Sequence, residues 1–275
     1  MPLYQAIILA IVQGLTEFFP VSSSAHLIVI PEFLGWNDGG LVFDVALHVG
    51  TLAAIIIYFF KDWVQVIANG LGFSHGGSRP DERSPLLLWY LVVATIPGAI
   101  AGWKWDKYAE HAWRSPYIIG AAAILVGIYM AVADRVSERK DGLDQLNWLE
   151  AIGVGISQAF AIIPGVSRSG STIATARFFH LDRETSARFS FLLSTPIIAG
   201  AAAKKFFDIH KQGGLPPEMR LPYAVGILVS LVVGIAVIAF FLKYLRHHSL
   251  AVFVWYRIIF GIIVIALAVF FRTGG

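Results

Sequence analysis

The residues that could do chemistry fall in two short segments of an otherwise apolar chain. The first segment holds an amide, a carboxylate, hydroxyls and an imidazole, carried by Gln13, Glu17, Ser22, Ser23, Ser24 and His26. A carboxylate buried among apolar residues must be paired, protonated or bound to a cation, so Glu17 is a candidate acid–base residue and metal ligand. Because Ser23 and His26 are three residues apart, their side chains are expected to lie on the same side of a helix, as in an activated nucleophile.

The second segment has the composition of a phosphate-binding loop. It runs Pro164-Gly165-Val166-Ser167-Arg168-Ser169-Gly170-Ser171-Thr172. Two glycines would let the backbone approach a ligand closely. A guanidinium, hydroxyls and the N–H groups of a following helix would bind phosphate oxygens. The candidate ligand-binding residues of the two segments are Arg168, Ser167, Ser169, Thr172, Ser22, Gln13, Gly165 and Gly170.

Each of these residues also has a purely structural interpretation. A serine before a helix is often a cap, and a single histidine near a membrane interface is often a hydrogen-bond donor. Asp44 and His48 are four apart and could pair within one helix. Arg257 could contact a ligand, form a structural pair or extend toward the membrane surface. The concentration of these residues in two short segments favours a functional interpretation of both.

The elements that position these segments must lie in a membrane. The chain has 275 residues, of which 57% are hydrophobic and 14% charged; soluble domains have about 25% charged residues. The chain contains no cysteine, which excludes disulfides, and its net charge of +3 includes no basic run that would indicate nucleic acid. The first apolar stretch lacks a preceding basic region and is not expected to be a cleaved signal peptide.

We therefore expect an all-α polytopic membrane protein forming a single domain over residues 1–275. Six stretches reach the length of about 20 residues that a spanning helix needs. They lie at roughly 41–60, 85–103, 116–133, 187–203, 223–245 and 250–271. Residues 61–84 are expected to form a long polar loop, and the charged segment 134–145 marks the midpoint.

The two polar segments interrupt stretches too short to span a bilayer, so each is expected to form a re-entrant helical hairpin. The hairpins cover about 4–34 and 149–179. Each precedes three spans, so 1–133 and 149–271 are expected to be inverted repeats, with both hairpin tips meeting at one central site. An even number of spans puts both termini on one side, and the loop charges do not indicate which side.

Both motifs together resemble the bacterial undecaprenyl-diphosphatase family linked to bacitracin resistance. The resemblance rests on Gln13-x-x-x-Glu17, Pro20-Val21-Ser22-Ser23-Ser24-Ala25-His26 and the segment 164–172, and it extends over essentially the whole chain. It implies catalytic roles for Glu17, Ser23 and His26 and diphosphate binding at Arg168. Many members have two carboxylates in the first motif; here the first is Gln13, so the substrate's own oxygens would have to supply much of any metal ligation.

The resemblance also implies a substrate, a cofactor and a location. The family removes the terminal phosphate of undecaprenyl diphosphate for peptidoglycan precursor recycling, with a divalent cation such as Mg²⁺ or Ca²⁺, in the bacterial inner membrane and on its extracytoplasmic side. The alternative function is a secondary transporter or flippase for a phosphorylated or prenyl-phosphate substrate, since inverted repeats with broken helices are typical of transporters. A structural scaffold would leave the Arg168 loop unexplained. Homodimerisation stays open, because small residues at 120–123 permit close helix contact.

Overall fold

The protein is a bundle of helices. The computed structural model describes residues 1–36, 40–73, 84–137, 142–211 and 214–273, and the regular secondary structure within these ranges is helical. Six of the described helices are long and apolar enough to cross a membrane. They are α3 (Gly40–Tyr58), α5 (Leu87–Glu110), α6 (Pro116–Val136), α9 (Arg183–Lys211), α10 (Pro217–Leu245) and α11 (Ala251–Thr273). The six spans expected from the sequence are therefore confirmed as helices, which makes the chain a multi-pass membrane protein.

Four shorter helices form two pairs, and each pair is joined by one of the polar loops. The first pair is α1 (Leu3–Thr16) and α2 (Ser23–Leu34), and the second is α7 (Trp148–Ala159) and α8 (Arg168–Phe178). The first loop contains Pro20, whose missing backbone N–H disfavours continuation of the helix. Asn147 and Glu150 form a reciprocal capping box that fixes the start of α7. These four short helices lie where the sequence predicted apolar segments too short to span a bilayer.

One element differs from the sequence prediction. Residues 60–70, most of which were expected to belong to a polar loop, form helix α4 (Phe60–Gly70) directly after α3. Lys61 and Asp62 suggested a loop, but Val66 is fully buried and Trp63 packs against the same core. Tertiary contacts therefore stabilise a helix in a segment whose polar residues suggested a loop. The remainder of that predicted loop, at 74–83, and part of the midpoint segment, at 138–141, lie outside the described residues.

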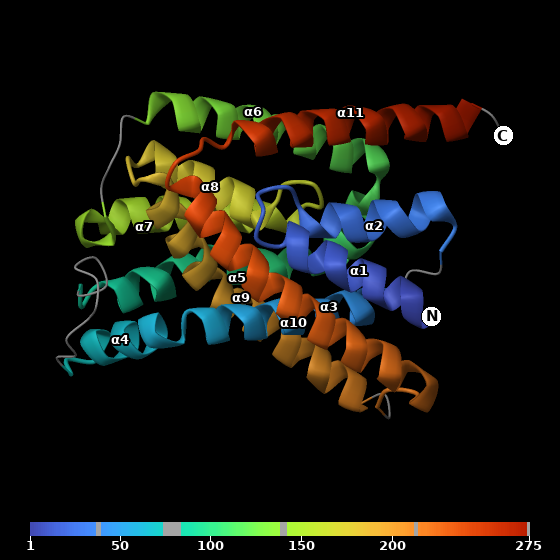
Figure 1. Ribbon diagram of the computed structural model, residues 1–275, viewed down its shortest axis with the longest axis horizontal. Helices are drawn as coiled ribbons and strands as arrows, with labels where there is room; N and C mark the ends of the chain where they lie inside the picture. The colour runs from blue at the N-terminus through green and yellow to red at the C-terminus, as the bar shows by residue number, and fades with distance from the viewer. Residues whose placement is uncertain (37–39, 74–83, 138–141, 212–213, 274–275) are drawn as a thin grey trace.

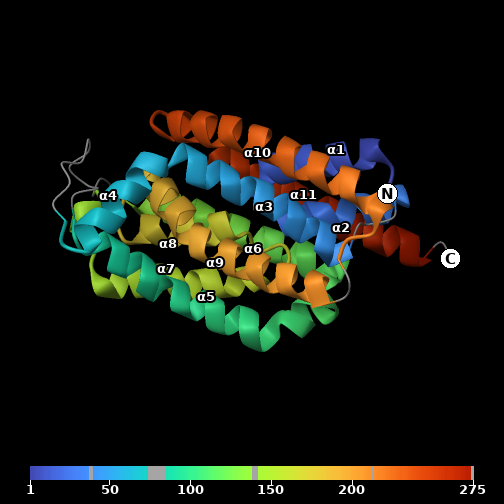
Figure 2. The same cartoon turned by 90° about the horizontal axis from the view of Figure 1, so that it is seen from below.

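The packing of the helices follows a recurring pattern. α6 lies against α11 and α3 against α10, while α1 packs on α10 and α7 packs on α5 (Figure 1). Seen from below, α5 lies on the opposite side of the bundle from α10 (Figure 2). Both termini lie at the same end of the bundle, as the even number of spans predicted. Both polar loops lie near the middle of its length.

Aromatic residues anchor the first polar loop in the core. The ring of Phe18 contacts Phe191 of α9 edge-on, with centroids 5.3 Å apart. Its neighbour Phe19 packs against Phe241 of α10 and Phe253 of α11, at 5.5 and 5.2 Å. Aromatic pairs of this geometry add to the free energy of burial. Three long helices therefore fix the loop that follows α1, together with the carboxylate that precedes it.

Candidate active site

Both polar loops turn at a serine whose backbone is left-handed. The φ angle is 78° at Ser22 and 70° at Ser167, and each serine directly precedes its helix, α2 or α8. Residues other than glycine rarely adopt this conformation, which costs roughly 1–3 kcal/mol and recurs at functional sites. In both loops the strained turn puts a polar side chain at the first helical position, Ser23 in α2 and Arg168 in α8.

The two loops contact each other directly. The backbone N–H of Gly165 donates to Ser22 Oγ at 3.2 Å, and Ser169 Oγ donates to the carbonyl of Phe19 at 3.1 Å. Gly165 has a φ of 96°, and a Cβ there would lie 2.4 Å from the carbonyl oxygen of Ile119 in α6. Only glycine fits this position. These contacts bring together segments far apart in the chain, as the sequence predicted.

Arg257 of α11 binds both loops from behind. Its guanidinium donates to the carbonyl of Pro20 in the first loop at 3.1 Å, and to the carbonyls of Gly165 and Val166 in the second at 2.7 and 3.0 Å. Its Nε donates to the carbonyl of Ala123 in α6 at 3.2 Å. The side chain is fully buried. Of the interpretations open from the sequence, the structure supports a structural role, because these donors are turned toward backbone carbonyls.

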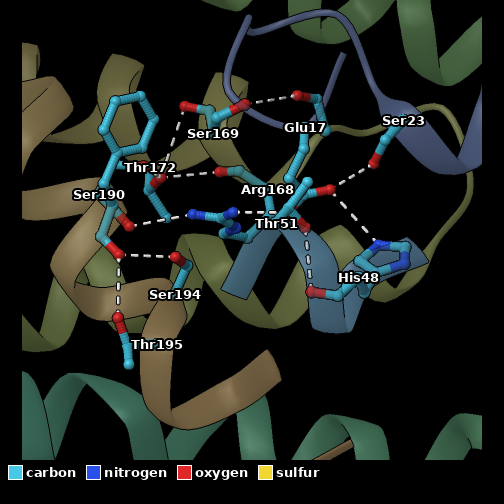
Figure 3. Close-up of polar contacts among 12 residues, drawn as sticks. Glu17, Ser23, His48, Thr51, Arg168, Ser169, Thr172, Ser190, Ser194 and Thr195 are labelled. Carbon is cyan, nitrogen blue, oxygen red and sulfur yellow. Dashed lines mark hydrogen bonds and ion pairs between the residues drawn. The ribbon is translucent and has the colours of Figure 1, made fainter. Parts of the chain in front are cut away.

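Glu17 is the central residue of the site (Figure 3). Its Oε1 accepts a hydrogen bond from Arg168 Nη2 at 2.7 Å. Its Oε2 accepts from Ser23 Oγ at 2.6 Å and from Gln13 Nε2 at 3.1 Å, and lies 3.4 Å from His48 Nε2 in α3. The carboxylate is only 6% exposed. It therefore links both loops and a membrane span through charge-assisted contacts, which are stronger than neutral ones.

The second loop and α9 hold Arg168 in place. Its Nη1 donates to the backbone carbonyl of Ser190 in α9 at 3.0 Å. Thr172 Oγ1 lies 2.7 Å from the hydroxyl of the same serine, which fixes α8 against α9 (Figure 3). A guanidinium carries several N–H donors in a planar fork, so the described contacts leave donors for a ligand's oxygens.

A cavity of about 270 Å³ opens beside these residues. Its polar lining comes from both loops: Glu17, Ser22, Ser23, Ser24, Ser167, Arg168 and Ser169. Its apolar lining includes Ile197, Ile198, Ala201 and Ala202 of α9, and His48 and Val45 from α3 also reach it. Charge and hydroxyls at one wall with aliphatic side chains at another suit a ligand that has an anionic head and an apolar tail.

Several predicted ligand-binding residues lie behind this cavity and do not line it. Gln13 and Thr172 are fully buried and hold Glu17 and Arg168. Gly165 approaches α6, and a Cβ at Gly170 would meet Ser167 and Arg257 Nη1 at 3.2 and 3.3 Å. The glycines were expected to let backbone approach a ligand; instead they let it approach protein. The reason is that the two loops pack directly against each other and against α6 and α11.

The expected pairing of Ser23 with His26 is wrong. His26 Nδ1 lies 2.7 Å from the carbonyl oxygen of Ser22, and Nε2 lies 2.6 Å from the hydroxyl of Tyr256. The imidazole stacks on Phe260 of α11 with centroids 4.4 Å apart. Ser23 instead donates to Glu17, because a carboxylate is a stronger acceptor than an imidazole, while α11 offers the ring an aromatic partner. His26 does not line the cavity.

The residue that sequence reasoning missed at the site is His48. Its spacing from Asp44 allows a pair within one helix, and its Nδ1 does lie 2.7 Å from the backbone carbonyl oxygen of that residue. Its Nε2, however, faces Glu17. A titratable residue in the middle of a membrane span was a usable signal. Its choice of partner depended on how α3 packs beside α1, which no local pattern encodes.

The described residues do not form a resident cation site. Among them there is no cluster of three or more carboxylate, histidine or cysteine side chains that could hold a metal. Both oxygens of Glu17 already face donors. Gln13 Oε1 is buried without a described partner, but one neutral oxygen is far short of the about six to eight oxygen ligands of Ca²⁺. This donor set fits an anion rather than a bound divalent cation.

Comparison with known proteins assigns the chain to a family. The family described as bacitracin resistance protein BacA matches residues 6–263. An undecaprenyl-diphosphatase of Pelotomaculum thermopropionicum is 45% identical over 268 residues, covering 98% of this chain and 97% of the relative. Proteins of the same name from Moorella thermoacetica and Rubrobacter xylanophilus are 46% and 42% identical, covering 97% and 96% of this chain and 98% of each relative. The chain therefore belongs to the bacitracin resistance protein BacA family.

Proposed function

We propose that this chain is an undecaprenyl-diphosphatase, an integral membrane hydrolase that removes the terminal phosphate of undecaprenyl diphosphate. The observation that carries the proposal is the Glu17 carboxylate, which joins the Ser23 hydroxyl and the Arg168 guanidinium at the wall of one cavity. In phosphoryl transfer, a base next to a hydroxyl can activate it as a nucleophile, and a nearby guanidinium can stabilise charge on the phosphoryl oxygens. Full-length relatives named for this activity support the same conclusion.

In this mechanism Ser23 is the nucleophile and Glu17 is its base. Ser23 Oγ forms a bond to the terminal phosphorus while its proton passes to Glu17 Oε2, 2.6 Å away. The bond from phosphorus to the bridging oxygen breaks, and the lipid monophosphate leaves with the electron pair. Glu17 gives that proton up to the departing lipid monophosphate and is ionised again. Water then attacks the phosphoserine, and Glu17 takes the water's proton and returns it to Ser23 Oγ as the bond from phosphorus to Oγ breaks, which releases inorganic phosphate and restores the serine. Arg168 and the hydroxyls of Ser167 and Ser169 stabilise the charge that develops on the phosphoryl oxygens.

A direct attack by water, with Glu17 as the base, is the close variant of this mechanism. The two are separated by phosphate release from purified protein in which Ser23→Ala is compared with wild type. A loss of more than about 10³-fold supports the serine nucleophile, and a small loss supports water. Since His26 lies outside the cavity, neither variant assigns it a proton-transfer role.

The architecture supports the proposed pair of inverted repeats, 1–133 and 149–271, within one membrane domain. In such a repeat α1 would correspond to α7, and α5 to α10. The packing of α1 on α10 then corresponds to the packing of α7 on α5. The left-handed serines at 22 and 167 are equivalent in this scheme. In Figure 1, α1 and α2 extend toward the end that holds the termini, and α7 and α8 toward the other end. We propose that both pairs are re-entrant hairpins, meeting in the middle of the membrane.

The same architecture would suit a carrier of prenyl phosphates, so the two functions need a direct test. Purified protein in detergent has no membrane gradient, and release of phosphate from undecaprenyl diphosphate there supports the hydrolase. Uptake of the lipid across liposomes without phosphate release would support the carrier. A carrier needs only to bind the phosphate, whereas the contact between Ser23 and Glu17 also provides a hydroxyl with a base, which favours the hydrolase.

The location of the protein and the source of its cation are also proposals. We place the protein in the bacterial inner membrane with its cavity open to the extracytoplasmic side, where the spent lipid carrier is released. We propose that Mg²⁺ or Ca²⁺ reaches the site on the diphosphate oxygens, since the described side chains do not form a resident site. The small residues at 120–123 give no support to a homodimer, because Gly120 packs on Gly261 of α11 within the chain.

A further inference from the structure

His48 is the one side chain from a membrane span that meets both the cavity and the Glu17 carboxylate among the described contacts. We propose that His48 is a positioning residue of the phosphoryl-transfer site: it holds Glu17 Oε2 on the Ser23 hydroxyl while Arg168 turns to the substrate. The inference rests on the proposed function, because it assumes that Glu17 is the base for Ser23.

The geometry of the ring gives His48 a defined orientation. Nδ1 lies 2.7 Å from the carbonyl oxygen of Asp44, and a carbonyl can only accept, so Nδ1 carries the hydrogen. Nε2 lies 3.4 Å from Glu17 Oε2, which also only accepts while the carboxylate is ionised. The ring can donate to both partners only as an imidazolium. His48 thus presents a second positive charge to Glu17, on a different oxygen from the one that Arg168 binds.

The position of His48 is fixed by close packing of α3. Two residues further on, a Cβ at Gly50 would lie 2.3 Å from the carbonyl oxygen of Ile227, so α3 lies directly on the backbone of α10. Next to it, Thr51 Oγ1 lies 3.5 Å from Gln13 Nε2, which connects α3 to α1. Because α3 cannot shift without breaking these contacts, the imidazole is a fixed reference point for the carboxylate.

A second fixed donor to Glu17 matters because Arg168 has two tasks. Its Nη2 donates to Glu17 Oε1 at 2.7 Å. A diphosphate competes for the same guanidinium, since phosphate oxygens bind arginine in the same fork geometry. When Arg168 turns toward the substrate, Glu17 would be free to rotate away from Ser23. His48 and Gln13 remain on Oε2 and keep that oxygen in place. Residues that orient a reactive carboxylate in this way affect turnover more than binding.

The test compares two substitutions of similar volume that differ in one property. His48→Gln keeps an N–H donor near the place of Nε2, whereas His48→Leu fills the space without a donor. Phosphate release from undecaprenyl diphosphate is measured in detergent, with kcat and KM determined separately and the melting temperature recorded for each protein. The matched control is His247→Ala, at an exposed histidine just beyond α10, which is expected to behave as wild type.

The expected result separates the donor from the bulk of the side chain. His48→Leu should lower kcat about 10- to 100-fold, by analogy with the loss of a hydrogen-bond partner that orients a metal-binding side chain. KM should stay close to wild type, because the Nε2 donor of His48 faces Glu17. His48→Gln should retain most of the wild-type kcat. His48→Gln and His247→Ala should melt close to wild type. His48→Leu leaves the buried Glu17 carboxylate with one partner fewer, so it should melt at a lower temperature but stay folded at the assay temperature.

Two results would overturn the inference while leaving the proposed function intact. One is an active wild type with His48→Leu turning over as fast as wild type. The other is equal loss of kcat in His48→Leu and His48→Gln, or a loss of kcat equal to the fraction of protein unfolded at the assay temperature, since either would point to packing rather than to donation. If wild-type protein itself releases no phosphate, the proposed function is what fails.

Discussion

Replacing Glu17 by glutamine removes one negative charge from the centre of the site and leaves the shape of the side chain almost unchanged. In the wild type that charge faces Arg168 Nη2 at 2.7 Å, Ser23 Oγ at 2.6 Å and Gln13 Nε2 at 3.1 Å, and His48 Nε2 lies 3.4 Å away. An amide oxygen can still accept from two of these donors, but it cannot take the proton of Ser23. Glu17→Gln should therefore abolish most of the activity while the protein stays folded.

The size of the effect follows from the role of the carboxylate. A positioned general base contributes about 10²- to 10⁴-fold, so Glu17→Gln should lower kcat by about 10³-fold, equivalent to about 4 kcal/mol. If Glu17 acts only through Ser23, the two losses are not independent. The double variant Glu17→Gln/Ser23→Ala should then be no slower than Ser23→Ala alone.

The assay is phosphate release from undecaprenyl diphosphate by detergent-purified protein, with the melting temperature as a check on folding. Loss of the buried ion pair should lower stability, but Arg168 keeps the carbonyl of Ser190 and the variant should stay folded. The reasoning fails if Glu17→Gln keeps more than about a tenth of the wild-type kcat. It also fails if the two losses multiply in the double variant, since Glu17 would then act on something other than Ser23.

Three further predictions concern the support of the site. Arg257→Met should lower the free energy of unfolding by about 3 kcal/mol or more, because buried carbonyls of both loops lose a charged donor, and chemical denaturation should show it. His26→Gln should keep kcat within about tenfold of wild type, because the ring is outside the cavity; a loss as large as that of Ser23→Ala would contradict this placement. Calorimetric titration of Ca²⁺ into the protein without lipid should give no stoichiometric heat, whereas a diphosphate lipid analogue should restore it; binding without lipid would reveal a resident site.

Some features of the fold could be predicted because they depend on local composition. A run of about 20 apolar residues has few alternatives to a spanning helix, and all six predicted spans are helices. The breaks at Pro20 and Pro164 are favoured locally, because proline lacks the N–H of a helical hydrogen bond, although α2, α5 and α9 each continue through an internal proline. The error at α4 has the opposite origin. Burial of Val66 and packing of Trp63 decide that segment, and both depend on residues elsewhere in the chain.

The sequence predicted which residues form the candidate site, but not which of them are hydrogen-bonded to each other. Glu17, Ser23 and Arg168 were identified by their chemistry in apolar surroundings, and they lie together at the cavity. The partner of Ser23 was predicted to be His26, from spacing along one helix. Helix spacing says which residues share a face, but it does not say which competing acceptor lies opposite that face. A carboxylate from the preceding helix competes more strongly than a neighbouring imidazole.

The sequence by itself determined that this chain spans a membrane, where its helices break, and that the breaks carry a carboxylate, hydroxyls and an arginine suited to a phosphate. Only the tertiary structure decided that His48 of α3 reaches Glu17, that Arg257 binds the loops from behind, and that His26 turns away to α11. The physical reason is the range of the interactions. Hydropathy and proline act within a helical turn or along one helix, whereas a hydrogen bond between helices depends on how whole helices pack.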